Sequence, residues 1–227
     1  MMQQSPSAVD PNLLAMLACP RDKLPVRAAG SLLVCEAGHR YPVVKGVPVL
    51  LCAERQQSLN SAYASLRAAQ TGVGSPFYLD TLGSLSETDK CIVEQDLYRG
   101  VAIDPVISWR VLATSGYGYS SLRGKLKSYP IPEIKLDPTN DGQWLLDVGC
   151  NWGRWSLSAA RKGWHVVGID PSLGALMAAR RMAAAEERKI AVVCGDARFM
   201  PFKAGTFDAV FSYSASMRQK WKSCSLR

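Results

Sequence analysis

Apolar residues in the C-terminal half of the chain form short runs separated by helical patterns. Runs of strand length occupy residues 144–147, 165–170, 190–194 and 207–212. Between them, residues 154–162 and 173–187 have helical character, with Gly163 placed to end the first helix and Ser172 to cap the second. The resulting order of strands and helices predicts a parallel sheet with right-handed crossovers.

The N-terminal part has shorter apolar runs interrupted by proline and glycine. Asp10 can cap a short helix that begins at Pro11. The apolar runs of residues 32–44 and 46–51 then predict a compact, β-rich unit. Residues 53–140 carry helical patterns but no motif that indicates chemistry, and we consider both a surface connection and a substrate cap there.

Two apolar strands end in acidic residues near a glycine loop. The apolar run of residues 144–147 ends in Asp147 and leads into a turn with Gly149 and Gly153. Asp170 ends the next strand, twenty-one residues beyond Gly149. In a parallel sheet both strand ends face one crevice, where such a loop holds a nucleotide-like ligand and the second acid binds ribose hydroxyls. Because Asp147 would repel a diphosphate, a ligand with an ammonium and a sulfonium group fits better than a dinucleotide.

Residues 143–214 resemble the class I S-adenosylmethionine-dependent methyltransferases, whose first motif reads apolar-Asp-x-Gly-Cys-Gly-x-Gly. The match continues through residues 168–170, 193–197, 200–202 and 207–212. The resemblance implies an α/β fold with a partial Rossmann-like parallel sheet, made of the first four strands of the family. Asn151 stands where the family usually has glycine. Because asparagine tolerates positive φ, we expect the loop to keep its shape.

The same resemblance implies S-adenosyl-L-methionine as the cofactor and a small-molecule acceptor, as in members related to quinone-biosynthesis enzymes. The implied contacts are Asp147, Gly149, Cys150, Asn151 and Gly153 around the methionine part, Asp170 with Pro171 at the ribose, Asp196 with Ala197 at the adenine, and Ser212 beside the methyl group. We assign no catalytic base, since Tyr213 is a weak candidate and His165, at the start of a buried strand, is expected to be structural.

The N-terminal unit resembles the small zinc-ribbon-like proteins that activate methyltransferases, through its Cys-Pro, Tyr-Pro-Val and Gly-Val-Pro-Val-Leu-Leu segments. Metal-binding members use two Cys-x2-Cys pairs, whereas this chain has Cys19-x2-Asp22 and Cys35-x3-His39. Two thiolates, a carboxylate and an imidazole can close a zinc site. A ribbon that holds the same β-structure without metal is the alternative.

The charge distribution does not favour a nucleic-acid partner. The net charge is +8, but residues 1–140 carry 14 Lys and Arg against 12 Asp and Glu, and residues 141–214 carry 9 against 7. Half of the excess therefore lies in residues 215–227, which have 4 basic and no acidic residues. Seven scattered cysteines and the absence of a leader or a long apolar run predict a cytoplasmic protein without a membrane segment.

These patterns predict four segments. They are a zinc-ribbon-like module at 1–52, a connecting region at 53–140, an incomplete methyltransferase core at 141–214 and a basic tail at 215–227. The tail lacks the apolar strand of the family, so we expect a C-terminally truncated enzyme whose fourth strand forms a sheet edge open to self-association. A non-catalytic cofactor-binding or interaction fragment, or an RNA methyltransferase, are the alternatives.

Overall fold

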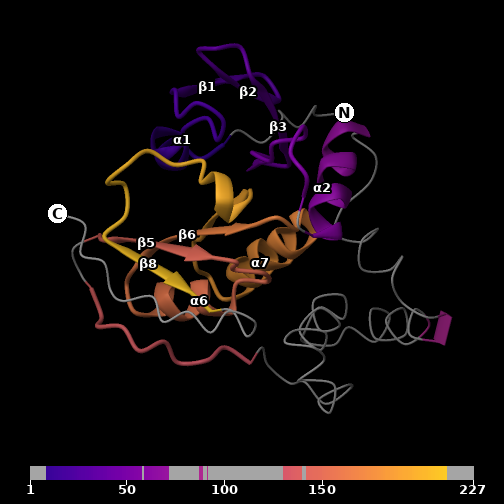
Figure 1. Ribbon diagram of the computed structural model, residues 1–227. Coiled ribbons are helices and arrows are strands. Elements are labelled where there is room, and N and C mark those ends of the chain that lie inside the picture. Colours follow the sequence, from indigo (N-terminus) through magenta and orange to yellow (C-terminus); the bar gives the residue numbers. More distant parts are fainter. Residues whose placement is uncertain are drawn as a thin grey trace, which may run out of the picture.

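The computed structural model describes residues 9–57, 59–71, 87–88, 91, 130–139 and 142–213, shown in Figure 1. Most of the expected connecting region and the tail of residues 215–227 lie outside the described residues. The N-terminal elements are α1 (Pro11–Met16), β1 (Val26–Ala29), β2 (Leu32–Cys35), β3 (Arg40–Val44), β4 (Val47–Pro48) and α2 (Asn60–Thr71). The C-terminal elements are β5 (Trp144–Val148), α6 (Arg154–Arg161), β6 (His165–Asp170), α7 (Leu173–Ala185), β7 (Ala191–Cys194), the 3-10 turn η2 (Ala197–Phe199) and β8 (Ala209–Ser212).

The C-terminal strands form a parallel sheet in the order β7-β6-β5-β8. Val148 of β5 is paired with Ile169 of β6 and with Ser212 of β8, and Asp170 is paired with Cys194 of β7. The carboxyl ends of all four strands therefore meet at one edge of the sheet. The α/β fold with a parallel sheet, expected from the sequence, is confirmed.

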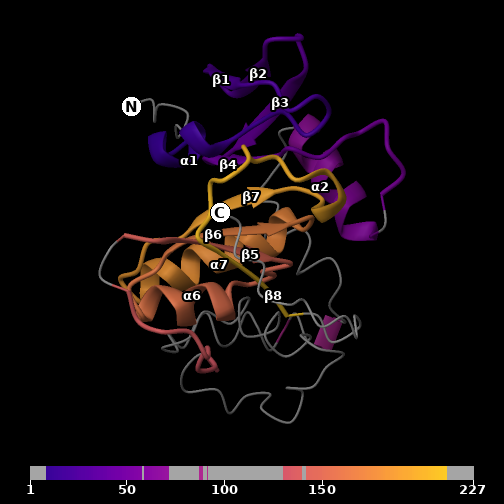
Figure 2. The same ribbon diagram turned by 60° about the vertical axis from the view of Figure 1, so that its left-hand side comes forward.

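Residues alternate along these strands between two covered faces. Leu145 of β5 packs with Val166 of β6 and with two alanines of α6, and Val192 of β7 packs with α7. On the other face, Leu146 packs with residues of the N-terminal module. Figures 1 and 2 show the same layering, with α6 and α7 on one side of the sheet and α1 with β1–β3 on the other. The N-terminal module thus supplies the second covering layer.

The N-terminal module, which the sequence predicted to be β-rich, is an antiparallel sheet in the order β1-β2-β3-β4. It also extends the parallel sheet, because Val49 forms a parallel bridge with Cys194. The backbone N–H of Leu50 donates to the Cys194 carbonyl at 2.7 Å. The two sheets are therefore joined beside the end of β7.

The predicted helix caps are present. Asp10 accepts a hydrogen bond from the N–H of Asn12 at 2.8 Å, and the Ser172 hydroxyl accepts from the N–H of Ala175 at 3.3 Å. Helix α7 ends at Ala185, two residues before the expected end, because Glu187 takes a left-handed φ of 53°. None of the helices in the described ranges is long and apolar enough to span a bilayer.

Candidate cofactor site and metal site

The loop after β5 contains three residues with positive φ, a backbone conformation that few residue types adopt readily. Gly149, Asn151 and Gly153 have φ values of 73°, 51° and 81°. The expectation that Asn151 would accept a left-handed conformation is confirmed. The N–H groups of Gly149 and Cys150 donate to the Ile169 carbonyl at 2.8 and 3.1 Å, which fixes the loop against β6. A Cβ on Gly149 would meet nothing within 4 Å, so space lies open over the loop.

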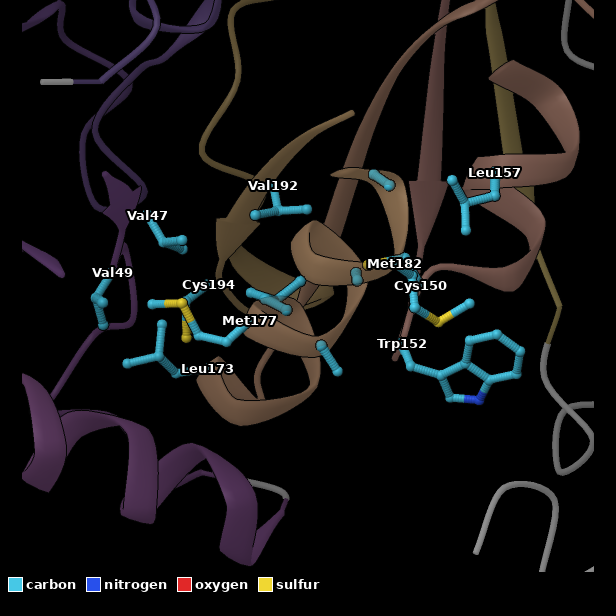
Figure 3. Packing of buried hydrophobic residues seen from close by; sticks show 14 of the residues in the cluster. Val47, Val49, Cys150, Trp152, Leu157, Leu173, Met177, Met182, Val192 and Cys194 are labelled. Atoms are coloured by element: carbon cyan, nitrogen blue, oxygen red, sulfur yellow. The ribbon is translucent and has the colours of Figure 1, made fainter. Parts of the chain in front are cut away.

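The far side of the loop is anchored in the core. Trp152 is fully buried, and a Cβ on Gly153 would lie 2.9 Å from the Cβ of Ala179 in α7. Figure 3 shows Trp152 and Cys150 at one end of this hydrophobic cluster and Val47 and Val49 of the N-terminal module at the other. Gly153 is therefore required by close packing as well as by its φ value.

Asp170 is oriented by two backbone groups at the end of β6. Its Oδ2 accepts a hydrogen bond from the N–H of Asn151 at 3.0 Å, and its Oδ1 accepts from the N–H of Ser172 at 2.8 Å. These bonds hold both oxygens of the carboxylate in fixed positions beside the loop, and each carboxylate oxygen can accept more than one hydrogen bond. This geometry suits a pair of neighbouring hydroxyl groups.

Pro171 is held by a residue from the N-terminal part of the chain. The hydroxyl of Ser65 in α2 donates to the Pro171 carbonyl and accepts from the N–H of Leu173, both at 2.8 Å. Ser65 is 1% exposed and thus caps α7 from a distant segment. Sequence reasoning missed this contact, because one serine in an alanine-rich helix carries no signal of a partner more than a hundred residues away.

Asp147 and Cys150 turn their side chains inward. The Ser156 hydroxyl donates to Asp147 Oδ2 at 2.6 Å, and Asp147 is 1% exposed. Burial raises the pKa of Asp147 to about 6, the Ser156 hydrogen bond lowers it, and the nearby negative charge of Asp170 raises it further. The Cys150 thiol faces Gly168, where a Cβ would lie 2.7 Å from its Sγ. Burial raises the pKa of this thiol well above its ordinary value.

The end of β7 brings Asp196 and Ala197 to the same edge. Asp196 caps η2 by accepting from the N–H of Arg198 at 2.8 Å. The guanidinium of Arg198 also binds this carboxylate and donates from Nη2 to the Gln56 carbonyl at 3.0 Å. Sequence reasoning did not single out Arg198, although its position two residues after Asp196 is the signal that could have done so.

At the end of β8, Ser212 donates from its hydroxyl to the Val148 carbonyl at 3.1 Å. Tyr213 is about half-exposed, and its ring centroid lies 5.0 Å from that of Trp155. His165 is exposed and stacks on Trp144 at 5.0 Å, at the amino end of β6. The strand that it begins is buried from Val166 to Ile169, as the sequence predicted. Among the described strands β8 is an edge, and self-association there stays a prediction.

The structure brings the four sequence-predicted metal ligands together. Ligand atoms of Cys19, Asp22, Cys35 and His39 all lie within 4.8 Å of one another. His39 Nδ1 is 3.5 Å from Cys19 Sγ, 3.3 Å from Cys35 Sγ and 2.9 Å from an Asp22 carboxylate oxygen. The Tyr41 hydroxyl, which sequence reasoning did not include, lies 3.1 Å from Cys19 Sγ.

Comparisons with known proteins find matches in both parts of the chain. The model of the methyltransferase domain family matches residues 145–224. A UPF0434 protein of Vesicomyosocius okutanii is 40% identical over 50 residues, which are 22% of this chain and 85% of that protein. Demethylmenaquinone methyltransferase of Thermobifida fusca is 40% identical over 70 residues, which are 30% of each protein.

Among solved structures, phosphoethanolamine N-methyltransferase 2 of Haemonchus contortus with S-adenosyl-L-methionine is 26% identical, with a TM-score of 0.32. That match covers 62% of this chain and 29% of the other. The chain thus spans less than a third of the length of either methyltransferase.

Proposed function

The chain belongs to the UPF0434 family through its N-terminal module and carries a methyltransferase domain in residues 145–224, and from this premise we propose that it transfers a methyl group from S-adenosyl-L-methionine to a small molecule. The site residues expected from the sequence fit this cofactor. Their strands end at one edge of the parallel sheet, around the open space over Gly149.

The observation that carries the proposal is the carboxylate of Asp170. Its two oxygens are held at the end of β6, beside the glycine loop, by the N–H groups of Asn151 and Ser172. The two ribose hydroxyls of a nucleoside would donate to these oxygens. The adenine would then lie toward Asp196 and Ala197, and the methionine part toward the loop of residues 149–153.

The bound cofactor supplies an electrophilic methyl group on a sulfonium. The residues of this chain have to align that methyl group with the acceptor atom and exclude water, which is the larger part of the catalytic task in such a displacement. Asp170 would fix the ribose, and Ser212, at the end of β8, would border the methyl group. We assign no general base.

A small acceptor is supported by two observations. The basic excess of residues 1–214 is only four charges, too few for a broad phosphate-binding face. The Thermobifida relative is named as a demethylmenaquinone methyltransferase, an enzyme whose acceptor is not a nucleic acid. An RNA acceptor is the second candidate and would appear as salt-dependent RNA binding.

Titration of S-adenosylhomocysteine into the purified chain tests the cofactor assignment. We expect saturable binding that Asp170→Asn weakens by about 30-fold or more, because a charge-assisted pair of hydrogen bonds to the ribose loses its acceptor charge. Asp137→Asn is the matched control, since Asp137 is exposed and lies away from the loop. If the wild-type chain is folded but does not bind, or if both variants bind alike, the assignment is wrong.

We propose that the cluster of Cys19, Asp22, Cys35 and His39 binds one zinc ion. In a tetrahedral zinc site, adjacent sulfur, nitrogen and oxygen ligand atoms lie about 3.3–3.8 Å apart. Three of the spacings fall in this range, with 3.5 and 3.3 Å from His39 Nδ1 to the two sulfurs and 3.7 Å from Cys35 Sγ to Asp22. Because the thiols must stay reduced, we also propose a cytoplasmic location.

Metal analysis and thermal unfolding test the zinc site. We expect one equivalent of zinc in the wild-type chain, and a fall in melting temperature of about 5 °C or more after chelation, since a closed zinc site contributes folding free energy. Cys35→Ser is expected to lose the zinc, whereas Cys52→Ser, at a buried thiol outside the cluster, is expected to keep it. Equal zinc contents in the two variants would contradict the site.

A further inference from the structure

Both oxygens of the Asp196 carboxylate are engaged by one neighbouring residue, Arg198. Arg198 donates to its Oδ1 from the backbone N–H at 2.8 Å and from Nε at 3.1 Å. Nε also lies 3.0 Å from Oδ2, and Nη2 donates to Oδ2 at 2.5 Å. These contacts come from three N–H groups, because the single Nε hydrogen is shared between the two oxygens, and together they engage both oxygens of the carboxylate.

This arrangement conflicts with the part that Asp196 would play in cofactor binding. The exocyclic amino group of adenine is a donor, and in the proposed function it would donate to this carboxylate. The side chain of Asp196 is only 11% exposed under the guanidinium. A neutral amino group competes poorly with a charged guanidinium for the same oxygens. The base and the Arg198 side chain therefore exclude each other at Asp196.

The contacts of Arg198 hold it in place but leave it able to move. Its Nη2 donates to the Gln56 carbonyl at 3.0 Å, and its guanidinium lies 5.6 Å from the centre of the Phe199 ring. The side chain is nonetheless 49% exposed, so it can swing into solvent without a change in the core. The backbone N–H of Arg198 would still donate to Asp196 Oδ1 after the guanidinium has moved away. This hydrogen bond would keep the Asp196 carboxylate in position.

We propose that Arg198 is a gate of the adenine end of the cofactor site. In the closed state, the guanidinium of Arg198 binds the Asp196 carboxylate and donates a hydrogen bond to the Gln56 carbonyl. In the open state, the guanidinium contacts neither residue. Only the open state accepts adenine, so the closed state lowers the apparent affinity for the cofactor. The proposal rests on the proposed cofactor function and adds a residue that regulates the same site.

Replacing Arg198 with an uncharged side chain is expected to increase the affinity of the chain for the cofactor. Exposed ion pairs contribute little to stability, and a well-aligned bidentate pair lies at the upper end of their range. Arg198→Met should therefore bind S-adenosylhomocysteine about two- to fivefold more tightly than the wild-type chain. Salt should also increase the affinity of the proteins that keep Arg198, because it screens the contact between Arg198 and Asp196.

The experiment is calorimetric titration of S-adenosylhomocysteine at about 50 mM and about 500 mM NaCl, which span strong and weak screening. The ligand has no net charge at neutral pH, so salt acts mainly through the protein. Arg198→Met is compared with Arg188→Met, which removes an exposed arginine beyond the end of α7. We expect tighter binding in Arg198→Met only, and affinity that rises with salt in the wild type and in Arg188→Met.

The outcomes separate the two proposals. If the wild type binds and Arg198→Met binds more weakly or equally, Arg198 positions Asp196 or has no role there, and the gate is wrong while the cofactor site stands. An affinity that falls with salt in the wild type would also contradict the gate. If neither protein binds while both are folded, the cofactor function fails and the gate fails with it.

Discussion

Gly163→Ala is expected to destabilise the protein by about 3–5 kcal/mol, one of the largest effects of any single methyl group in this fold. Gly163 has a φ of 91°, and a Cβ there would lie 2.1 Å from the carbonyl oxygen of Thr139. That oxygen belongs to the backbone, so no side-chain rotation can relieve the collision. The approach is fixed because the N–H of Thr139 donates to the Lys162 carbonyl at 3.0 Å.

Gly205→Ala is the matched control for this prediction. Gly205 also has a left-handed φ, 69°, but a Cβ there would meet nothing within 4 Å. Gly205→Ala should therefore lower the free energy of unfolding by only about 1–2 kcal/mol, which is the cost of a left-handed conformation for alanine. Urea unfolding of both variants isolates the collision as the difference between them. Equal losses would mean that residues 134–139 can move away from the end of α6 at no cost.

The sequence predicted the features that depend on neighbours in the chain. The alternation of apolar residues placed the four parallel strands, and the side chains of Ser172 and Asp10 signalled the starts of two helices. Asn151 was recognised as compatible with a left-handed bend because that preference belongs to the residue itself. The short Cys19-to-Asp22 and Cys35-to-His39 spacings likewise fixed which side chains could meet.

The sequence did not predict contacts between distant segments. No local pattern pairs Leu50 with Cys194, Ser65 with Leu173, or the Gln56 carbonyl with Arg198. Nor did it predict that the N-terminal module would pack on one face of β5, β6 and β7, since apolar residues in a small β-rich unit also suit a separate core. These contacts depend on docking geometry, which apolar periodicity does not encode.

Asp147 shows why a motif position does not fix the environment of its side chain. The resemblance assigned this carboxylate to the methionine part of the cofactor, whereas its side chain is buried against Ser156 and has a pKa of about 6. The ordinary value is 3.8, so between about pH 4 and pH 6 the native state binds more protons than the unfolded state. The free energy of unfolding should therefore fall as the pH rises through this window.

Asp147→Asn is expected to remove this fall, which amounts to about 3 kcal/mol for a shift of about two pH units. The amide oxygen of asparagine can still accept the Ser156 hydrogen bond, so above pH 6 the variant should be more stable than the wild type by up to that amount. Urea unfolding from about pH 4 to pH 8 measures the difference between the two proteins, in which the titration of other carboxylates cancels. Asp137→Asn, at an exposed carboxylate, should follow the wild type. A constant difference between wild type and Asp147→Asn across the window would show that the buried carboxylate ionises with its ordinary pKa.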